Sequence, residues 1–176
     1  MKRIIPVLIP LLLLMGGLTQ AQTLKIGYTS PQMILTKMEA YKLKQSELEE
    51  FAKVLQKQFE TKQQAYQRRA EEVRGNFQNL APVEQEKVMK EFQEKEQELV
   101  KLQQDSQQKL QKKEEELMEP LYKQIKEAIN AVSEEQGYTY IINAFDGTGS
   151  ANLLYAKESL DVTDAVLQKL GVSAGE

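Results

Sequence analysis

The sequence of 176 residues contains no cysteine, no histidine and no tryptophan. Without cysteine, no disulfide can hold the fold together, and attachment of a lipid to a cysteine is excluded. Histidine is the side chain most often used for acid–base catalysis near neutral pH, and it is the commonest metal ligand. We therefore expect a protein that is not an enzyme and that holds no cofactor and no metal.

The first 21 residues have the composition of a secretory signal peptide. Lys2 and Arg3 provide a positive start, an apolar stretch runs from Ile4 to Leu18, and the small residue Ala21 follows. A transmembrane anchor is the alternative. However, the apolar stretch has only about 15 residues, whereas a spanning helix needs about 20. We expect export and cleavage after Ala21.

The chain that remains after this cleavage is acidic. It has 155 of the 176 residues, and loss of Lys2 and Arg3 lowers the basic residues from 23 to 21 against 26 acidic ones, a net charge of −5. A generic nucleic-acid-binding protein has the opposite balance, so no nucleic-acid partner is expected. The length suits one domain, residues 22–176.

Residues 31–136 have the composition of a long helical segment. They are dense in Glu, Gln, Lys and Leu, and a looser apolar series from Met89 to Val132 follows a more regular one. Spacings of three, four or seven residues are typical of a coiled-coil seam. The regular series consists of Tyr41, Leu48, Phe51, Leu55, Phe59, Tyr66, Val73 and Phe77.

The segment from Gly75 to Pro82 interrupts this helical sequence. Gly and Asn tolerate the left-handed conformation that ends many helices, and Pro can only begin a new one. We therefore expect an antiparallel hairpin of two helices, each about 60–75 Å long at a rise of 1.5 Å per residue. One continuous coiled-coil rod is the alternative. Pro120 is expected to kink the returning helix or to begin a separate segment.

The two ends of the mature chain are predicted to form a small β-sheet body, residues 23–30 and 137–176. Residues 23–28 alternate as a half-buried strand does, residues 138–142 are aromatic and β-branched, and residues 153–156 form a third strand after a hairpin loop. Asp161 or Thr163 can cap a final helix that Gly171 ends. So small a sheet buries little alone, and we expect it to form an oligomer core through Ile26, Tyr28, Ile141, Ile142, Leu153 and Tyr155.

Two motifs superficially suggest catalysis. The first, Asp146-Gly147-Thr148-Gly149, is similar to an aspartic-protease or phosphate-binding loop, but the lysine and the second aspartate that such sites need are missing. The second, Glu114-Glu115-Glu116, lies beside Lys112 and Lys113, as on an ordinary charged helix face. We interpret the first motif as a turn and the second as a solvated face.

Basic residues gather near the predicted turn of the hairpin. Residues 61–90 carry six basic and four acidic side chains, a net of +2, which leaves −7 for the rest of the mature chain. Such a tip can attract anionic lipid or acidic partners, or it can simply keep the turn soluble. The candidate contact residues at the tip are Arg68, Arg69, Arg74, Phe77, Leu80, Lys87 and Lys90.

The order of these segments resembles the Skp/OmpH family of periplasmic chaperones. The resemblance covers the mature chain and is most specific near its end. There the pattern runs from Gly137-Tyr138-Thr139-Tyr140-Ile141-Ile142, through Leu153-Leu154-Tyr155-Ala156, to Leu160-Asp161-Val162-Thr163.

The resemblance implies a mainly α-helical homotrimer, in which the strands build a barrel-like body and three helical hairpins project as tentacles. It implies an ATP-independent periplasmic holdase that keeps unfolded outer-membrane proteins in the cavity between the tentacles, with no catalytic residues. Peripheral contact with anionic lipid or lipopolysaccharide is a further implied property, although the best-known members are basic and this mature chain is acidic. The alternative is a structural coiled-coil protein of the envelope, which would favour a rod without a terminal sheet.

Overall fold

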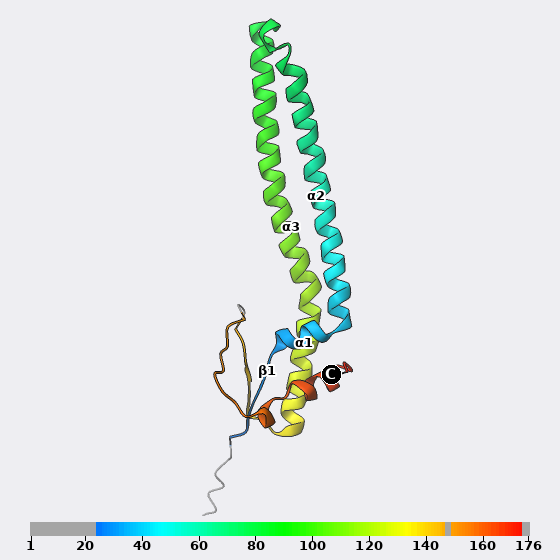
Figure 1. Ribbon diagram of the computed structural model, residues 1–176, viewed down its shortest axis with the longest axis vertical. Helices are drawn as coiled ribbons and strands as arrows, with labels where there is room; N and C mark the ends of the chain where they lie inside the picture. The colour runs from blue at the N-terminus through cyan, green and yellow to red at the C-terminus, as the bar shows by residue number, and fades with distance from the viewer. Residues whose placement is uncertain (1–23, 147–148, 174–176) are drawn as a thin grey trace, which may run out of the picture.

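The computed structural model describes residues 24–146 and 149–173, which form a long two-helix hairpin rising from a small body (Figure 1). The predicted signal peptide lies outside the described residues. None of the described helices is both long and apolar enough to cross a membrane. The elements are β1 (Ile26–Thr29), α1 (Pro31–Lys37), α2 (Glu39–Arg74), the 3₁₀ turn η1 (Phe77–Asn79), α3 (Pro82–Gln136), β2 (Tyr140–Asn143), the 3₁₀ turn η2 (Glu158–Leu160) and α4 (Thr163–Lys169).

Helices α2 and α3 pack side by side, so the predicted hairpin is confirmed and the continuous rod is wrong. Pro82 is the first residue of α3, and the Glu84 carboxylate accepts the Ala81 N–H at 3.1 Å. Gly75 differs from the prediction, because its φ of −72° is right-handed. The Gln85 side chain instead closes the turn by donating to the carbonyl oxygens of Phe77 and Leu80, each at 3.1 Å.

The seam between α2 and α3 is narrow. Of the residues of α2, Leu55 alone is buried, with an exposed fraction of 7%. Nearer the tip, the rings of Tyr66 and Phe92 meet edge to face with centroids 5.4 Å apart. A seam this thin buries little apolar area, so the hairpin also depends on the high helix propensity of its Glu, Gln, Lys and Leu residues.

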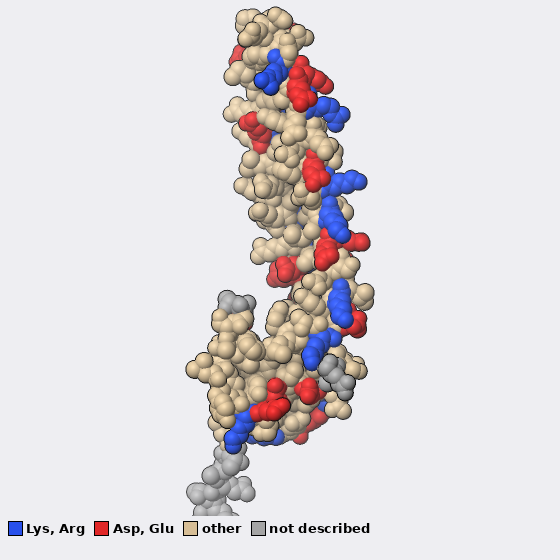
Figure 2. Space-filling view, viewed as in Figure 1, with Lys and Arg blue, Asp and Glu red and all other residues tan. Residues whose placement is uncertain are grey.

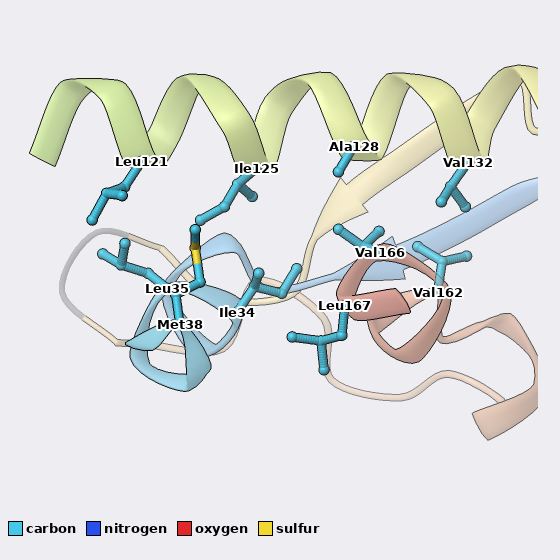
Figure 3. Packing of buried hydrophobic residues seen from close by; sticks show 10 residues of the cluster. All are labelled: Ile34, Leu35, Met38, Leu121, Ile125, Ala128, Val132, Val162, Val166 and Leu167. Atoms are coloured by element: carbon cyan, nitrogen blue, oxygen red, sulfur yellow. The ribbon is translucent and has the colours of Figure 1, made fainter. Parts of the chain in front are cut away.

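The hydrophobic core lies in the body, between α1, the last part of α3, and α4 (Figure 3). Burying one such aliphatic side chain stabilises a fold by about 1.5–3 kcal/mol. Ser is a favoured N-cap and Pro31 follows it at the first helical position, so the sequence predicts that Ser30 caps α1. The Ser30 hydroxyl accepts the Met33 N–H at 3.3 Å, as this predicts. The core residues are Ile34, Leu35, Met38, Leu121, Ile125, Ala128, Val132, Val162, Val166 and Leu167.

The outgoing helix is divided at Met38, where the sequence predicts one uninterrupted helix from Pro31. Met38 has extended backbone angles of −77° and 126°, so α1 ends before it and α2 begins after it. Its buried side chain extends toward Ile125 of α3 (Figure 3). The contact of Met38 with α3 offsets the loss of helical hydrogen bonds at the break. The sequence carries no sign of this break, because neither Gly nor Pro stands at Met38.

The returning helix remains continuous through Pro120, so the separate segment considered for that position is wrong. Figure 1 shows a bend in the axis of α3 where it passes α1. Glycines end two helices as predicted: Gly137 after α3 and Gly171 after α4, each with a φ of 69°. Asp161 acts at the start of α4, where its carboxylate accepts the Thr163 N–H at 2.8 Å.

The sheet contains two strands, β1 and β2, which pair in parallel. On the other side of β1, the N–H of Val162 donates to the carbonyl oxygen of Tyr28 at 3.0 Å. The third predicted strand, residues 153–156, is wrong. The loop hairpin has only the antiparallel bridge Phe145–Ala151, and residues 154–156 pair with no other described segment. A β-rich sequence becomes a strand only where a neighbouring strand is present.

Candidate functional site

The six residues predicted for the oligomer core lie on two faces of the sheet and in the loop after it. The register places Ile26 opposite Tyr140 and Tyr28 opposite Ile142 on one face. Ile141 lies opposite Gly27 on the other face and packs against the body's own core. Leu153 is half-buried and Tyr155 is exposed.

Large apolar side chains remain uncovered on β2 and on the chain after it. Leu154 is 96% exposed and Tyr155 is 83% exposed, and Tyr140 and Ile142 are 59% and 41% exposed. Figure 1 shows this part of the chain standing apart from α2 and α3. Such a concentration is unusual for the surface of a monomer and marks an interaction surface. We call the set formed by Tyr140, Ile142, Phe145, Leu154 and Tyr155 the body patch.

A small polar cavity of about 280 Å³ adjoins this sheet between β1, α1 and the start of α4. Tyr28 lines it together with Glu158 and Asp161. Burial, followed by the negative charges of Asp161 and Glu158, raises the pKa of the Tyr28 hydroxyl. The phenol therefore stays protonated at neutral pH, and it can donate a hydrogen bond but not act as a base.

The described residues offer no metal site, since they contain no group of three or more Asp or Glu side chains with a suitable arrangement. Glu114, Glu115 and Glu116 are exposed on α3, and Glu116 lies 3.8 Å from Lys112. The predicted solvated face is therefore observed there. Of the Asp146-Gly147-Thr148-Gly149 motif, the two central residues lie outside the described residues.

The basic residues predicted for the tip lie on both helices near the turn. Arg69 and Lys87 line one groove there, so the hairpin places one residue of the outgoing group beside one of the returning group. Arg69 is engaged with the carboxylates of Glu91 and Glu72, and Lys90 lies 4.0 Å from Glu94. The basic charge of the tip is thus partly offset by acidic neighbours.

The two apolar residues predicted for the tip line different grooves. Phe77 lines a groove of about 670 Å³ with Met89 and Phe92. Leu80 lines the second groove, of about 450 Å³, together with Arg69 and Lys87. Both side chains are half-buried. Their buried part stabilises the tip, and their exposed part is apolar surface that a partner can contact.

One face of the hairpin is held together by ion pairs between α2 and α3. Lys62 lies 2.6 Å from Glu98, Arg69 lies 3.2 Å from Glu91, and Lys113 lies 2.7 Å from Glu47. These cations hold the pKa of each carboxyl below its usual range, mainly by hydrogen bonding. We call this the ion-pair face, formed by Glu47, Lys62, Arg69, Glu91, Glu98 and Lys113.

The opposite face carries less charge in the middle of the hairpin, where the Glu60 carboxylate accepts a hydrogen bond from the Gln56 side chain at 2.9 Å. Successive helical residues are about 100° apart, so Gln63 lies on the other side of the seam from Lys62, and Val100 lies about 200° from Glu98. Figure 2 shows charged side chains along the edge formed by α2 and little charge over the middle of α3. We call the uncharged residues on this side the neutral face, formed by Gln56, Phe59, Gln63, Val100, Gln103 and Gln107.

The neutral face opens into a cavity of about 310 Å³ between the helices. Phe59 and Leu110 contribute apolar surface, and Ser106 occupies the position where a larger apolar residue would fill the seam. The Ser106 hydroxyl donates to the Leu102 carbonyl at 2.6 Å, so it needs no partner across the seam. Every residue lining the cavity is uncharged: Ala52, Leu55, Gln56, Phe59, Gln103, Ser106, Gln107 and Leu110.

The sequence prediction concentrated on the tip and missed this division of the hairpin into two faces. A partial signal was available, because Gln56, Phe59 and Gln63 recur at three- and four-residue spacing, with Glu60 as the charged residue between them. The exposed Leu154 was likewise expected in a strand, and not as part of an uncovered surface.

Comparison with known proteins gives two findings. The family described as outer membrane protein (OmpH-like) matches residues 25–170 of the chain. A crystal structure of a Caulobacter crescentus CB15 protein, assigned as an OmpH-like outer membrane chaperone, is similar in fold at a TM-score of 0.69 and 16% identity; the match covers 84% of this chain and 83% of that one. The search of curated proteins found no match.

Proposed function

The chain belongs to the OmpH-like family of outer membrane proteins, and from this membership we propose that it is an ATP-independent periplasmic holdase for unfolded outer-membrane proteins. The family is one of periplasmic chaperones and is non-enzymatic. The lack of histidine and cysteine agrees with a function that needs no catalysis.

The observation that carries the proposal is the body patch. Leu154 and Tyr155 are almost fully exposed, and a soluble protein rarely leaves such residues uncovered beside a short sheet edge. Covering them with copies of the same chain gives the homotrimer that the family resemblance implies. The strands of three chains would then form a common body from which three hairpins project.

The hairpin suits a holdase because its apolar surface is spread thinly along its length. Met89, Val83 and Val100 are all more than half exposed on α3. Many weak contacts of this kind can retain an unfolded chain without imposing a shape on it. Release then depends on the weakness of each contact and requires no nucleotide.

The test uses the mature protein and a urea-unfolded outer-membrane β-barrel protein. Light scattering after dilution of the urea should show aggregation of the barrel protein alone and little aggregation with an equimolar amount of trimer. Size-exclusion chromatography with light scattering should give a complex of one trimer with one barrel chain. A protein that leaves aggregation unchanged, or that forms end-to-end filaments, would instead be a structural coiled-coil protein of the envelope.

The proposed peripheral contact with anionic lipid or lipopolysaccharide is tested separately. Arg68, Arg74 and Lys87 are exposed at the tip and provide the positive charge for it. Flotation with vesicles that contain anionic lipid should retain the protein only at low salt. Equal recovery with neutral and anionic vesicles would remove lipid binding from the proposal.

A further inference from the structure

We propose that the neutral face is the surface on which the hairpin holds a client, and that it selects extended segments without charged side chains. This inference rests on the proposed function and assigns it to one surface. The neutral face lies midway along the hairpin, whereas the tip residues and the ion-pair face lie elsewhere on the same two helices.

The absence of charge limits what can bind there. A charged client residue that enters the central cavity would lose water without gaining an ionic partner, because the lining of this cavity contains no Asp, Glu, Lys or Arg. Burying an unpaired charge is strongly unfavourable. An uncharged segment incurs no such cost.

The cavity supplies apolar contact for such a segment. Phe59, Leu55 and Leu110 form its apolar lining, and its volume of about 310 Å³ can admit a client side chain. Val100, 56% exposed, extends the apolar surface along α3. A side chain from a client would complete a seam that Ser106 leaves incompletely filled.

The glutamines supply the polar part of the interaction. Each glutamine side chain has both donors and an acceptor, so Gln63, Gln103 and Gln107 can pair with peptide N–H and carbonyl groups in either orientation. In an unfolded chain these backbone groups are hydrogen-bonded to water, which glutamine side chains can replace. Glutamine therefore matches any extended segment without requiring a specific sequence.

The strands of outer-membrane barrels have this chemistry. They alternate apolar residues, which later face lipid, with polar residues that face the interior. A segment of this kind would place apolar side chains in the cavity and its polar backbone against the glutamines. The ion-pair face offers no equivalent, because its charged groups already pair with one another across the seam.

The first experiment adds charge to the neutral face. Gln63, Gln103 and Gln107 are exposed, so the triple variant Q63K/Q103K/Q107K should keep the helical content of the wild type. The matched control Q58K/Q97K/Q108K adds the same charge at exposed glutamines outside the neutral face. With a urea-unfolded β-barrel protein as probe, the first triple should raise the Kd about tenfold and the control should stay within about twofold.

The same positions are changed to Glu in a second pair of triples, Q63E/Q103E/Q107E and Q58E/Q97E/Q108E. If the neutral face excludes charge of either sign, the first Glu triple should weaken binding as the Lys triple does. Weakening by Glu and strengthening by Lys would show that only attraction to an acidic client is measured, and it would overturn the inference.

The second experiment locates the client directly. The chain has no cysteine, so a single Q107C or Q108C substitution provides one labelling site. These neighbouring residues point about 100° apart on α3, with Gln107 at the cavity and Gln108 outside its lining. An environment-sensitive fluorophore should shift to shorter wavelength with the unfolded barrel at position 107 and not at position 108.

The outcomes separate this inference from the proposed function. If the wild type fails to prevent aggregation, the proposed function is wrong. If the wild type captures the barrel protein but both Lys triples bind equally well, or the fluorophore shifts equally at both positions, the function stands and the neutral face is not its binding surface.

Discussion

The guanidinium of Arg69 on α2 and the carboxylate of Glu91 on α3 form two hydrogen bonds, each 3.2 Å long. This paired geometry is the strongest form of an arginine–carboxylate contact, and it links the two helices near the hairpin turn. Glu98 and Glu47 make comparable contacts with Lys62 and Lys113 further along the same face. The ion-pair face thus joins the helices where the apolar seam is thin.

These contacts predict a pH dependence of the hairpin. The pKa values of Glu47, Glu91 and Glu98 lie below their ordinary value of 4.5 in the folded state, so each carboxylate stabilises the fold at neutral pH. That contribution is fully present above the unfolded pKa and is lost as pH falls through the folded value. Amide hydrogen exchange, corrected for the intrinsic exchange rate at each pH, should show that α2 and α3 are less protected at about pH 3 than at about pH 6. The variant E47Q/E91Q/E98Q should lose most of this difference; an unchanged difference would show that the ion pairs contribute nothing.

Gly27 is predicted to be essential to the body. A β-carbon at this position would lie 2.9 Å from Cε1 of Tyr138 and 3.1 Å from Cγ1 of Val162, which itself is buried. Gly27→Val should therefore cost about 1–3 kcal/mol and lower the Tm by several degrees. Gly75→Ala is the control, because its β-carbon would meet no atom within 4 Å. Equal melting of Gly27→Val and the wild type would show that the body repacks freely.

Leu154 is predicted to hold the oligomer together without supporting the fold of one chain. Its side chain is 96% exposed, so Leu154→Asp loses no contact within the chain, but it would place an unpaired charge between subunits. Light scattering should give the mass of a monomer with unchanged helical circular dichroism. Ile141→Asp is the comparison: Ile141 packs against the core, so this variant should lose both assembly and thermal stability. A trimer that persists in Leu154→Asp would remove the body patch from the interface.

The tip charges are predicted to affect the rate of client capture. Changing Arg68, Arg69, Arg74, Lys87 and Lys90 to Glu should slow capture of an acidic client at low salt, and the effect should fade at physiological ionic strength, where charges are screened beyond about 8 Å. Arg69 also pairs with Glu91, so its change can destabilise the hairpin as well as remove an attractive charge. The single variant R69E therefore measures how much of the effect comes from lost stability. Equal rates for the wild type and the fivefold variant at low salt would show that these residues serve only solubility.

The hairpin could be predicted from the sequence because its signals are local. The heptad-like spacing from Tyr41 to Phe77, the break between Gly75 and Pro82, and the cap at Ser30 each depend on residues within a few turns of one another. The structure confirms all three elements. Gly75 was the exception, because a chain can turn at glycine without using its left-handed conformation.

The features that could not be predicted depend on contacts between distant residues. Met38 leaves the helix because its side chain enters a core formed partly by Ile125 and Leu121. The parallel pairing of β1 with β2 similarly depends on how α3 returns to the body. Leu154 and Tyr155 have strand-forming neighbours in sequence, but no described segment pairs with them as a strand.

The parallel pairing of β1 with β2 has a consequence for secretion. Ile26 and Tyr140 are register partners although 114 positions separate them, so in the proposed export the strand that crosses first must wait for almost the whole chain to follow. The two long helices need only local contacts and can form during that wait. The body, and any assembly that depends on it, then closes last, once translocation is nearly complete. If the proposed export and trimer hold, a chain that folds in this order displays its hairpin before it assembles, and newly exported copies of itself are among the first unfolded chains that it meets.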